Sequence, residues 1–264
     1  MADATSLTPR SEPVTVTRLE EGAWWLVALK NGNGNILDKS SIQALTEIFR
    51  TAARTPELKA ICIEGEGKHF SFGASVAEHL PDEVGEMLPE FHTMFREMAR
   101  CSVFLMAAIR GRCLGGGLEL AAFCHRVIAA PDAKLGQPEI TLGVFAPVAS
   151  VFLAERVGRG HADDLCISGR VIDADEALRM RLVDQVSDDP KAAALAYAQE
   201  HLLARSASSL RFAIRAARSD LDERFAVALA RVERIYLDEL MATHDAAEGV
   251  RSFVEKRRPR WENR

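Results

Sequence analysis

The stretch CLGGGLELAAF, residues 113–123, places three consecutive glycines between an apolar run and a short apolar helical pattern. Glycine loses much backbone entropy on folding, so three in a row indicate that the main chain must come close to another group. The first N–H groups of a helix have no partner within it and lie at the positive end of the helix dipole. Such a helix start can hold a carbonyl oxygen that becomes negative, or a phosphate, or it can serve tight helix packing.

Strands and helices alternate on both sides of this junction. Apolar runs of β type and amphipathic segments follow one another, with turn residues between them. Two strands followed by a helix recur three times, which predicts an α/β fold built from stacked ββα units that share one core. We expect strands at 14–19, 23–29, 58–64, 69–72, 102–109, 125–130 and 134–135, and helices at 38–54, around 91–98 and within 113–123.

The chain becomes mainly helical after Leu142. Only 182–186 has the pattern of a strand in this part, and Asp173 followed by Glu176 fits the reciprocal capping pattern at the start of a helix. We predict a flexible lead-in at 1–13, a ββα domain at 14–200 and a helical region at 201–264, whose apolar faces need a partner, expected to be another subunit. The expected helices lie at 148–157, 161–167, 174–180, 191–205, 207–218, 220–241 and 246–256.

The composition is that of an ordinary globular protein of 264 residues, with 48% hydrophobic residues and a formal net charge of -5. An acidic balance gives no electrostatic attraction to nucleic acid. The longest apolar runs, such as 103–109, are far shorter than the roughly 20 residues of a membrane span, and 1–13 has no apolar signal core. We expect a cytoplasmic protein that binds neither nucleic acid nor membrane.

The cysteines and histidines indicate neither a disulfide framework nor a metal site. Five cysteines form an odd set without a CxxC pair, so they are expected to be buried small apolar residues. Seven histidines include no HExxH motif. No metal is predicted.

Two glutamates stand in unusually apolar surroundings. Glu119 follows the glycines in LGGGLELAAF, and Glu139 lies 20 positions later in LGQPEITLG. An ionised carboxylate is costly to bury unless it is paired, hydrogen-bonded or protonated. The two carboxylates are therefore candidates for a general acid and a general base that meet across a pocket. The alternative is two unrelated glutamates at the surface or at helix caps.

A second glycine turn occurs earlier, in HFSFGAS at 69–75. A free N–H after Gly73 would give a second donor to an oxygen held by the glycine-rich helix start. Two such donors are the usual minimum of an oxyanion hole, and losing one costs roughly 3 kcal/mol of transition-state stabilisation. Taken alone, the segment is equally an ordinary turn.

In series, these three motifs resemble those of the crotonase superfamily, which has an HFxxGAD strand end, a GGGxEL helix start and an FGQPEIxLG strand exit. The order and the spacing agree, as does the later segment VGRGHADDLCISGRVIDADEALRMRLVDQV at 157–186. The resemblance covers the chain from about Val14 to its C-terminus. It implies a spiral of ββα units, a C-terminal helical trimerisation region, and a homotrimer or a hexamer made of two trimers.

Matched motif by motif, the resemblance implies a coenzyme A thioester site. The N–H groups of Ala74 and Gly116 would form the oxyanion hole that holds the thioester oxygen. Glu119 and Glu139 match the two acids of family hydratases, whereas family isomerases often keep one, so the match favours hydration of an acyl-CoA substrate. Coenzyme A is then part of the substrate, and no separate cofactor is implied.

The sequence departs from the family pattern around the expected acyl pocket. The tripeptide GAS at 73–75 stands where the family has GAD, and APVASVFL at 146–153 replaces a glycine-rich PGxGGTQRL segment. Phe72 and Phe145 are candidates for contact with an acyl ring, although phenylalanine at such places more often belongs to the core. The remaining substrate-binding candidates come from the two turns: Gly73, Ser75, Gly115 and Gly117.

The stretch SFGASVAEHLPDEV at 71–84 more narrowly resembles the cyclohexa-1,5-diene-1-carbonyl-CoA hydratases of anaerobic benzoyl-CoA breakdown. This implies that the oxyanion hole polarises a conjugated dienoyl thioester so that its far end accepts hydroxide. The product would be 6-hydroxycyclohex-1-ene-1-carbonyl-CoA, formed without a redox cofactor. Two alternatives stay open: a hydratase or isomerase of straight-chain enoyl-CoA and, from a different class, a non-catalytic or RNA-binding protein with the crotonase fold.

Overall fold

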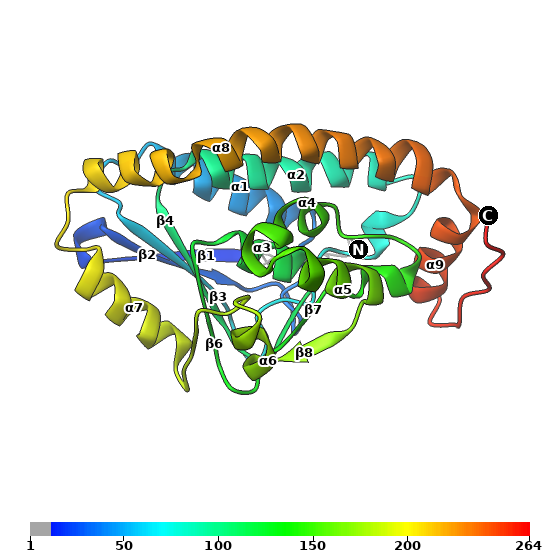
Figure 1. Ribbon diagram of the computed structural model, residues 1–264, viewed down its shortest axis with the longest axis horizontal. Coiled ribbons are helices and arrows are strands. Elements are labelled where there is room, and N and C mark those ends of the chain that lie inside the picture. Colours follow the sequence, from blue (N-terminus) through cyan, green and yellow to red (C-terminus); the bar gives the residue numbers. More distant parts are fainter. Residues whose placement is uncertain (1–11) are drawn as a thin grey trace, which may run out of the picture.

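The computed structural model describes residues 12–264, which form two β-sheets surrounded by helices (Figure 1). The larger sheet has the strand order β1-β2-β3-β4-β6-β9, with β1 antiparallel to β2 and the other neighbours parallel. The smaller sheet has the order β5-β7-β8, with β8 antiparallel to β7. The strands are β1 (Val14–Leu19), β2 (Trp24–Leu29), β3 (Ala60–Gly65), β4 (Phe104–Ile109), β5 (Arg112–Leu114), β6 (Arg126–Ala129), β7 (Lys134–Gly136), β8 (Val171–Asp173) and β9 (Gln185–Val186).

Helices cover both faces of the larger sheet. Figure 1 shows α8 running along α1 and α2 on one side, with α7 across the sheet from them. Alternate residues of β3 face the two layers, because Ile61 and Ile63 belong to the main core while Ala60 and Cys62 pack with α7. The helices are α1 (Lys39–Ala53), α2 (Val84–Arg100), α3 (Gly116–Phe123), α4 (Pro147–Val157), α5 (Arg159–Ser168), α6 (Ala174–Arg179), α7 (Pro190–His201), α8 (Ala207–Arg234) and α9 (His244–Val254).

Short helical turns join several of these elements. Four are 3-10 turns and one, η4, is a π turn that continues α8. They are η1 (Glu20–Gly22), η2 (Ala77–His79), η3 (Pro138–Leu142), η4 (Ile235–Glu239) and η5 (Leu240–Ala242). Two of them, η2 and η3, carry residues of the site described below.

The predicted α/β architecture, with ββα units followed by a helical C-terminal part, is confirmed. The hairpin of β1 and β2 and the cap of α1 are also as predicted, since Asp38 Oδ1 accepts a hydrogen bond from Ser41 N at 3.0 Å. Asp173 Oδ1 caps α6 by accepting from Glu176 N at 2.9 Å. The Glu176 side chain pairs with Arg170 instead, so only half of the reciprocal cap forms.

The strand predicted at 69–72 was wrong. Only Ser71 makes a bridge there, to Cys113. The Asn35 side chain explains why no longer ladder forms, because its Nδ2 donates to His69 O at 2.8 Å and so occupies a carbonyl that a strand partner would need. Phe72 N donates to Gly34 O on the same side of the loop.

Two predictions in the helical part also need correction. Val171–Asp173 forms a strand, β8, that the sequence did not indicate, since three residues are too few to show a period of two. The helices expected at 207–218 and 220–241 are one helix, α8, followed by the π turn. Asp220 does not interrupt it because its side chain, 82% exposed, points into solvent.

The lead-in predicted at 1–13 lies almost wholly outside the described residues, and the domain boundary at 200 stays a prediction. Over residues 12–264 no helix is both long and apolar enough to cross a membrane. All five cysteines are free thiols, and the four that are fully buried are Cys62, Cys101, Cys113 and Cys124.

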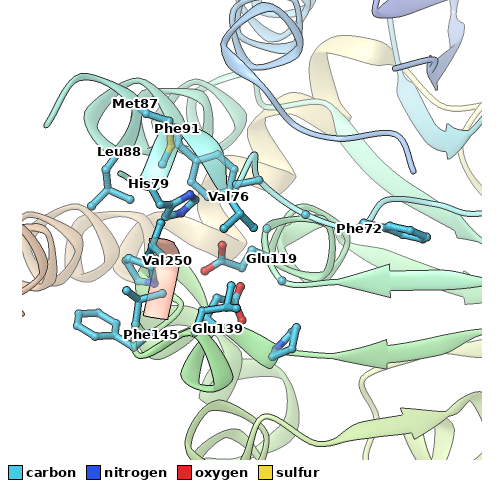
Figure 2. A pocket seen from close by; sticks show the side chains of 18 residues that line it. Phe72, Val76, His79, Met87, Leu88, Phe91, Glu119, Glu139, Phe145 and Val250 are labelled. Carbon is cyan, nitrogen blue, oxygen red and sulfur yellow. The ribbon is translucent and has the colours of Figure 1, made fainter. Parts of the chain in front are cut away.

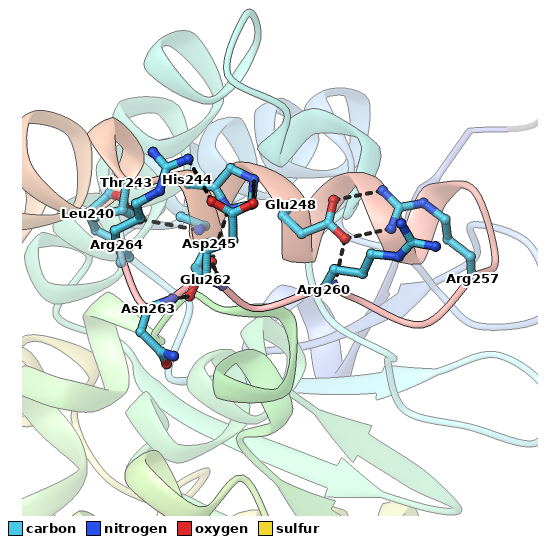
Figure 3. A network of polar contacts seen from close by, with 11 residues as sticks. Leu240, Thr243, His244, Asp245, Glu248, Arg257, Arg260, Glu262, Asn263 and Arg264 are labelled. Carbon is cyan, nitrogen blue, oxygen red and sulfur yellow. Dashed lines mark hydrogen bonds and ion pairs between the residues drawn. The ribbon is translucent and has the colours of Figure 1, made fainter.

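The C-terminal segment 255–264 folds back along α9 (Figure 3). Asp245 at the start of α9 accepts main-chain hydrogen bonds from Glu262 at 2.8 Å and from Asn263 at 2.7 Å. Glu248, one turn later, accepts from Arg260 N at 2.8 Å. Two carboxylates of α9 therefore fix this segment in place.

Between these bonds, Trp261 packs over a close contact of α9 with the end of η3. A Cβ atom on Gly249 would overlap the carbonyl oxygen of Leu142 and lie 2.9 Å from the Trp261 ring. Glycine is therefore required for α9 to approach η3 this closely. The contact fixes η3, which carries Glu139, relative to Val250 of α9.

The Gly249 contact can be tested by filling its space. Gly249→Ala should lower the free energy of unfolding by about 3 kcal/mol, because the methyl group forces main-chain atoms apart in a packed region. Gly160→Ala is the matched control, since Gly160 is also helical and has no atom within 4 Å of its Cβ position. Urea denaturation measures both, and an equal stability of the two variants would contradict the packing described.

Candidate active site

One pocket brings together the segments singled out in the sequence (Figure 2). It has an empty volume of about 620 Å³, its opening to solvent included. Residues of η2, α2, α3, η3 and α9 contribute to its wall. Most of the wall is apolar: Val76, Met87, Leu88, Phe91, Leu142, Val144, Phe145, Pro147 and Val250.

Glu119 lies on α3, with its carboxylate at the pocket and only 3% of the residue exposed. Its Oε1 accepts a hydrogen bond of 2.7 Å from Ala149 N, and Val148 N also donates to the carboxylate. Both amides belong to the first turn of α4, where N–H groups have no partner in the helix and the dipole favours a negative charge. Burial raises the pKa of Glu119, and these two hydrogen bonds oppose that rise.

Glu139 lies on η3 and faces the same pocket (Figure 2). Burial raises the pKa of Glu139, and the negative charge of Glu119 raises it further. With its amide nitrogen turned toward the site, Gln137 places Nε2 3.2 Å from each oxygen of the Glu139 carboxylate. Among residues 12–264, no main-chain N–H of another residue donates a hydrogen bond to this second carboxylate.

The two glutamates therefore share protons unequally. Two carboxylates close together in an apolar site cannot both ionise at low cost, so the pair retains a proton to a higher pH than an exposed glutamate would. The N–H groups of α4 favour the anion at Glu119, and the retained proton is favoured at Glu139. The site thus contains one carboxylate able to accept a proton and one carboxylic acid able to give one.

Two main-chain N–H groups line the pocket without a partner. The bridge between Leu37 and Ala74 is formed by hydrogen bonds to Gly73 O and from Ser75 N, so Ala74 N takes no part in it. Gly116 N begins α3 and has no acceptor within the helix. Among residues 12–264, neither Ala74 N nor Gly116 N donates a hydrogen bond.

Glycine residues allow these two amides to lie close together. A Cβ atom on Gly73, which has φ +102, would lie 3.1 Å from Gly116 N, and one on Gly116 would lie 3.1 Å from Ala74 N. Gly115 has φ +53, and a Cβ atom there would lie 2.6 Å from Glu139 Oε1. The third glycine of the run, Gly117, packs against Ser71 instead. The glycines thus allow the loop at Gly73, the start of α3 and the Glu139 carboxylate to lie in close contact.

The structure places the predicted site residues in three groups. Six of them meet at the pocket: Gly73, Ala74, Gly115, Gly116, Glu119 and Glu139. The two aromatic candidates also line it, but Phe72 is 41% exposed and lies toward one end in Figure 2, while Phe145 packs against Tyr236 with ring centroids 5.1 Å apart. Ser75 and Gly117 do not line it, because their contacts are with Leu37 and Ser71.

Three residues near the site were not singled out from the sequence. Gln137 could have been found, since it stands two positions before Glu139 in the same motif. His79 lines the pocket from η2, which only the path of that loop reveals. Tyr236 is fully buried in the π turn, and both burial and the charges of the two glutamates raise its pKa. Tyr236 is far along the chain from both glutamates, so the sequence gives no sign that they lie near one another in the fold.

No group of three or more His, Cys, Asp or Glu within residues 12–264 is placed to hold a metal ion.

Known proteins resemble this chain over nearly its whole length. The family model described as enoyl-CoA hydratase/isomerase matches residues 21–264. The chain is 49% identical to a cyclohexa-1,5-dienecarbonyl-CoA hydratase of Thauera aromatica, over 96% of this chain and 98% of that protein. It is 34% identical to a probable enoyl-CoA hydratase of Mycobacterium leprae, over 87% of this chain and 90% of that protein.

Solved structures agree. The crystal structure of carnitinyl-CoA hydratase from Mycobacterium avium is similar with a TM-score of 0.85 at 29% identity, covering 96% of this chain and 100% of that chain. An enoyl-CoA hydratase from Bacillus halodurans shares the fold, with a TM-score of 0.84 at 17% identity, covering 91% and 99%. The chain, with its ββα fold and its carboxylate pair, belongs to the enoyl-CoA hydratase/isomerase family, the crotonase superfamily indicated by its motifs.

Proposed function

We propose that this protein adds water to cyclohexa-1,5-diene-1-carbonyl-CoA and forms 6-hydroxycyclohex-1-ene-1-carbonyl-CoA. The observation that carries the proposal is that two carboxylates and two unpaired N–H groups line one apolar pocket. The 49% identity to the Thauera aromatica hydratase of that substrate supports the ring-shaped acyl group. A straight-chain enoyl thioester, hydrated or isomerised, is the alternative.

In the proposed complex, the thioester oxygen accepts hydrogen bonds from Ala74 N and Gly116 N. The hydroxyl of the product is on the ring carbon β to the carbonyl, so hydroxide adds there and not at the far end of the diene. An electron pair then moves onto the thioester oxygen. Fixed N–H donors stabilise the negative charge without reorganisation, and each is typically worth roughly 3 kcal/mol in the transition state. Coenzyme A is part of the substrate, and the proposal includes no further cofactor.

The two carboxyl groups carry out the two proton transfers of the hydration. Ionised Glu119 takes one proton from the water molecule, whose oxygen then bonds to the β carbon. Glu139 gives its proton to the other end of the conjugated diene, which leaves one ring double bond conjugated with the thioester. One water is consumed and no electrons are transferred to or from the ring. Return of the proton from Glu119 to Glu139 restores the starting pair.

The proposal includes the cytoplasm as location and a homotrimer, or a hexamer of two trimers, as assembly. Large apolar side chains on the helical part support a subunit interface, since Phe212 and Val227 of α8 are 65% and 75% exposed. Ile167 of α5 is 71% exposed. Sedimentation equilibrium measures the mass of the assembly, and a monomer would contradict this part of the proposal.

The acyl group is tested with a panel of thioesters. The purified protein should hydrate cyclohexa-1,5-diene-1-carbonyl-CoA with a higher kcat/KM than crotonyl-CoA, because the apolar pocket is expected to fit a ring. Incorporation of ¹⁸O from labelled water and mass spectrometry of the product measure both reactions. Rapid turnover of crotonyl-CoA with none of the cyclic dienoyl ester would reject the narrow substrate and favour the straight-chain alternative.

The carboxylate pair is tested by isosteric substitution. Glu119→Gln and Glu139→Gln should each lower kcat by roughly 10²–10⁴-fold, because each removes one proton-transfer step. Binding of the unreactive cyclohexanecarbonyl-CoA should change little in either variant. The control is Glu47→Gln, a surface change on α1 that should leave kcat unaltered. A near-normal rate in either active-site variant would show that the pair does not do the chemistry.

The raised pKa of Glu139 predicts a pH-dependent cost to folding. The folded protein holds this proton more tightly than the unfolded chain, so the free energy of unfolding falls as pH rises above the ordinary glutamate pKa of 4.5 and through the raised pKa. Glu139→Gln cannot ionise and should become progressively more stable than the wild type over this range. Thermal unfolding at pH 5 and pH 9 measures the difference, and an equal gap at both would contradict the raised pKa.

A further inference from the structure

The pocket contains one polar side chain that this mechanism does not use. His79, at the end of η2, lies among Met87, Leu88 and Phe91 and faces the region of Glu119 (Figure 2). Among the described residues of the pocket wall, the other ionisable side chains are the two glutamates. An imidazole in otherwise apolar surroundings needs a hydrogen-bond partner, because burying an unpaired polar group costs free energy.

The hydrogen bond of one ring nitrogen defines what the other can do. His79 Nδ1 lies 2.8 Å from Ser75 O, and a carbonyl oxygen only accepts, so Nδ1 carries a hydrogen. Burial lowers the pKa of His79, which keeps the ring neutral. Nε2 then has a lone pair and no hydrogen, so it can only accept.

The part of the chain that the structure describes supplies no matching donor. Among residues 12–264, no group donates a hydrogen bond to His79 Nε2. His79 Nε2 is not among the side-chain atoms buried without a partner, so it is open to the pocket and its donor is a water molecule or a group of the bound acyl-CoA. The cyclic dienoyl group and the thioester have no O–H or N–H group to offer at this end, whereas the attacking water and the hydroxylated product each have an O–H group.

We infer that His79 Nε2 accepts a hydrogen bond from the oxygen that is added to the acyl group. The inference rests on the proposed function and deepens it. Of the two O–H groups of the attacking water, one gives its proton to Glu119 and the other remains on the product. The second O–H donates to His79, first in the water molecule and then in the ring hydroxyl. His79 is thus a specificity residue that distinguishes a hydroxylated acyl group from an unhydroxylated one.

The test compares two ligands that differ by this hydroxyl. In the Glu139→Gln background, which should slow turnover greatly, calorimetry measures the dissociation constants of 6-hydroxycyclohex-1-ene-1-carbonyl-CoA and cyclohex-1-ene-1-carbonyl-CoA. Adding His79→Met, which removes the acceptor, should reduce the preference for the hydroxylated ligand roughly tenfold. His79→Gln should retain much of the preference, because its amide oxygen can lie near the place of Nε2.

A purely structural role would give a different result. Equal weakening of both ligands, or an unchanged ratio of their dissociation constants, would overturn the inference. Each variant is first checked by circular dichroism, and His79→Leu replaces His79→Met if the latter does not fold. Because the readout is a ratio within one variant, a general loss of affinity cannot imitate the expected effect.

Failure of the proposed function can be separated from failure of this inference. If the wild type hydrates crotonyl-CoA but not the cyclic dienoyl ester, the narrow substrate is wrong. The same ratio is then measured with 3-hydroxybutyryl-CoA and butyryl-CoA. A roughly tenfold loss of preference in His79→Met would support the role of His79 there, and an unchanged ratio would overturn it.

Discussion

The hydrogen bond from Ala149 N to Glu119 Oε1, 2.7 Å long, joins the fold to the chemistry of the site. It makes the N-terminus of α4 a hydrogen-bond partner of Glu119, while no such bond reaches Glu139 in the described part of the chain. Burial raises the pKa of both Glu119 and Glu139, but within the described residues only Glu119 accepts main-chain hydrogen bonds from another residue, which stabilise its anion. Two like groups in one pocket therefore differ in their affinity for a proton. An acid and a base can coexist there at the same pH.

The same pocket depends on main chain that passes unusually close to other main chain. Because Gly73 and Gly116 have no side chain, the loop after β3 can pack against the start of α3, and almost no room is left there for a Cβ atom. Gly115 does the same for the Glu139 carboxylate. On the other side of the pocket, Gly249 allows α9 to pack closely against the end of η3. Two carboxylates of α9 hold the C-terminal segment along this helix through main-chain hydrogen bonds. Residues from very different parts of the chain thus determine the position of one carboxyl group.

Short motifs explain why much of this could be predicted from the sequence. Glu119 and Glu139 stand out because each is a charge within an apolar run, and the structure brings both to one pocket with Ala74 and Gly116; their catalytic roles remain predictions. His79 and Tyr236 could not be found in this way. The place of His79 depends on the path of a loop, and Tyr236 lies on the π turn η4, far along the chain from both glutamates. The wrong strand at 69–72 has a similar cause, since a single side chain, Asn35, holds that segment as a loop.

The central claim is that two N–H groups and two carboxyl groups converge on one thioester. A crystal structure of the protein with the unreactive cyclohexanecarbonyl-CoA tests it most directly. The account predicts that the thioester oxygen lies about 2.9 Å from both Ala74 N and Gly116 N, with the ring between Glu119 and Glu139. A thioester oxygen directed away from either amide, or a ring bound outside this pocket, would contradict it.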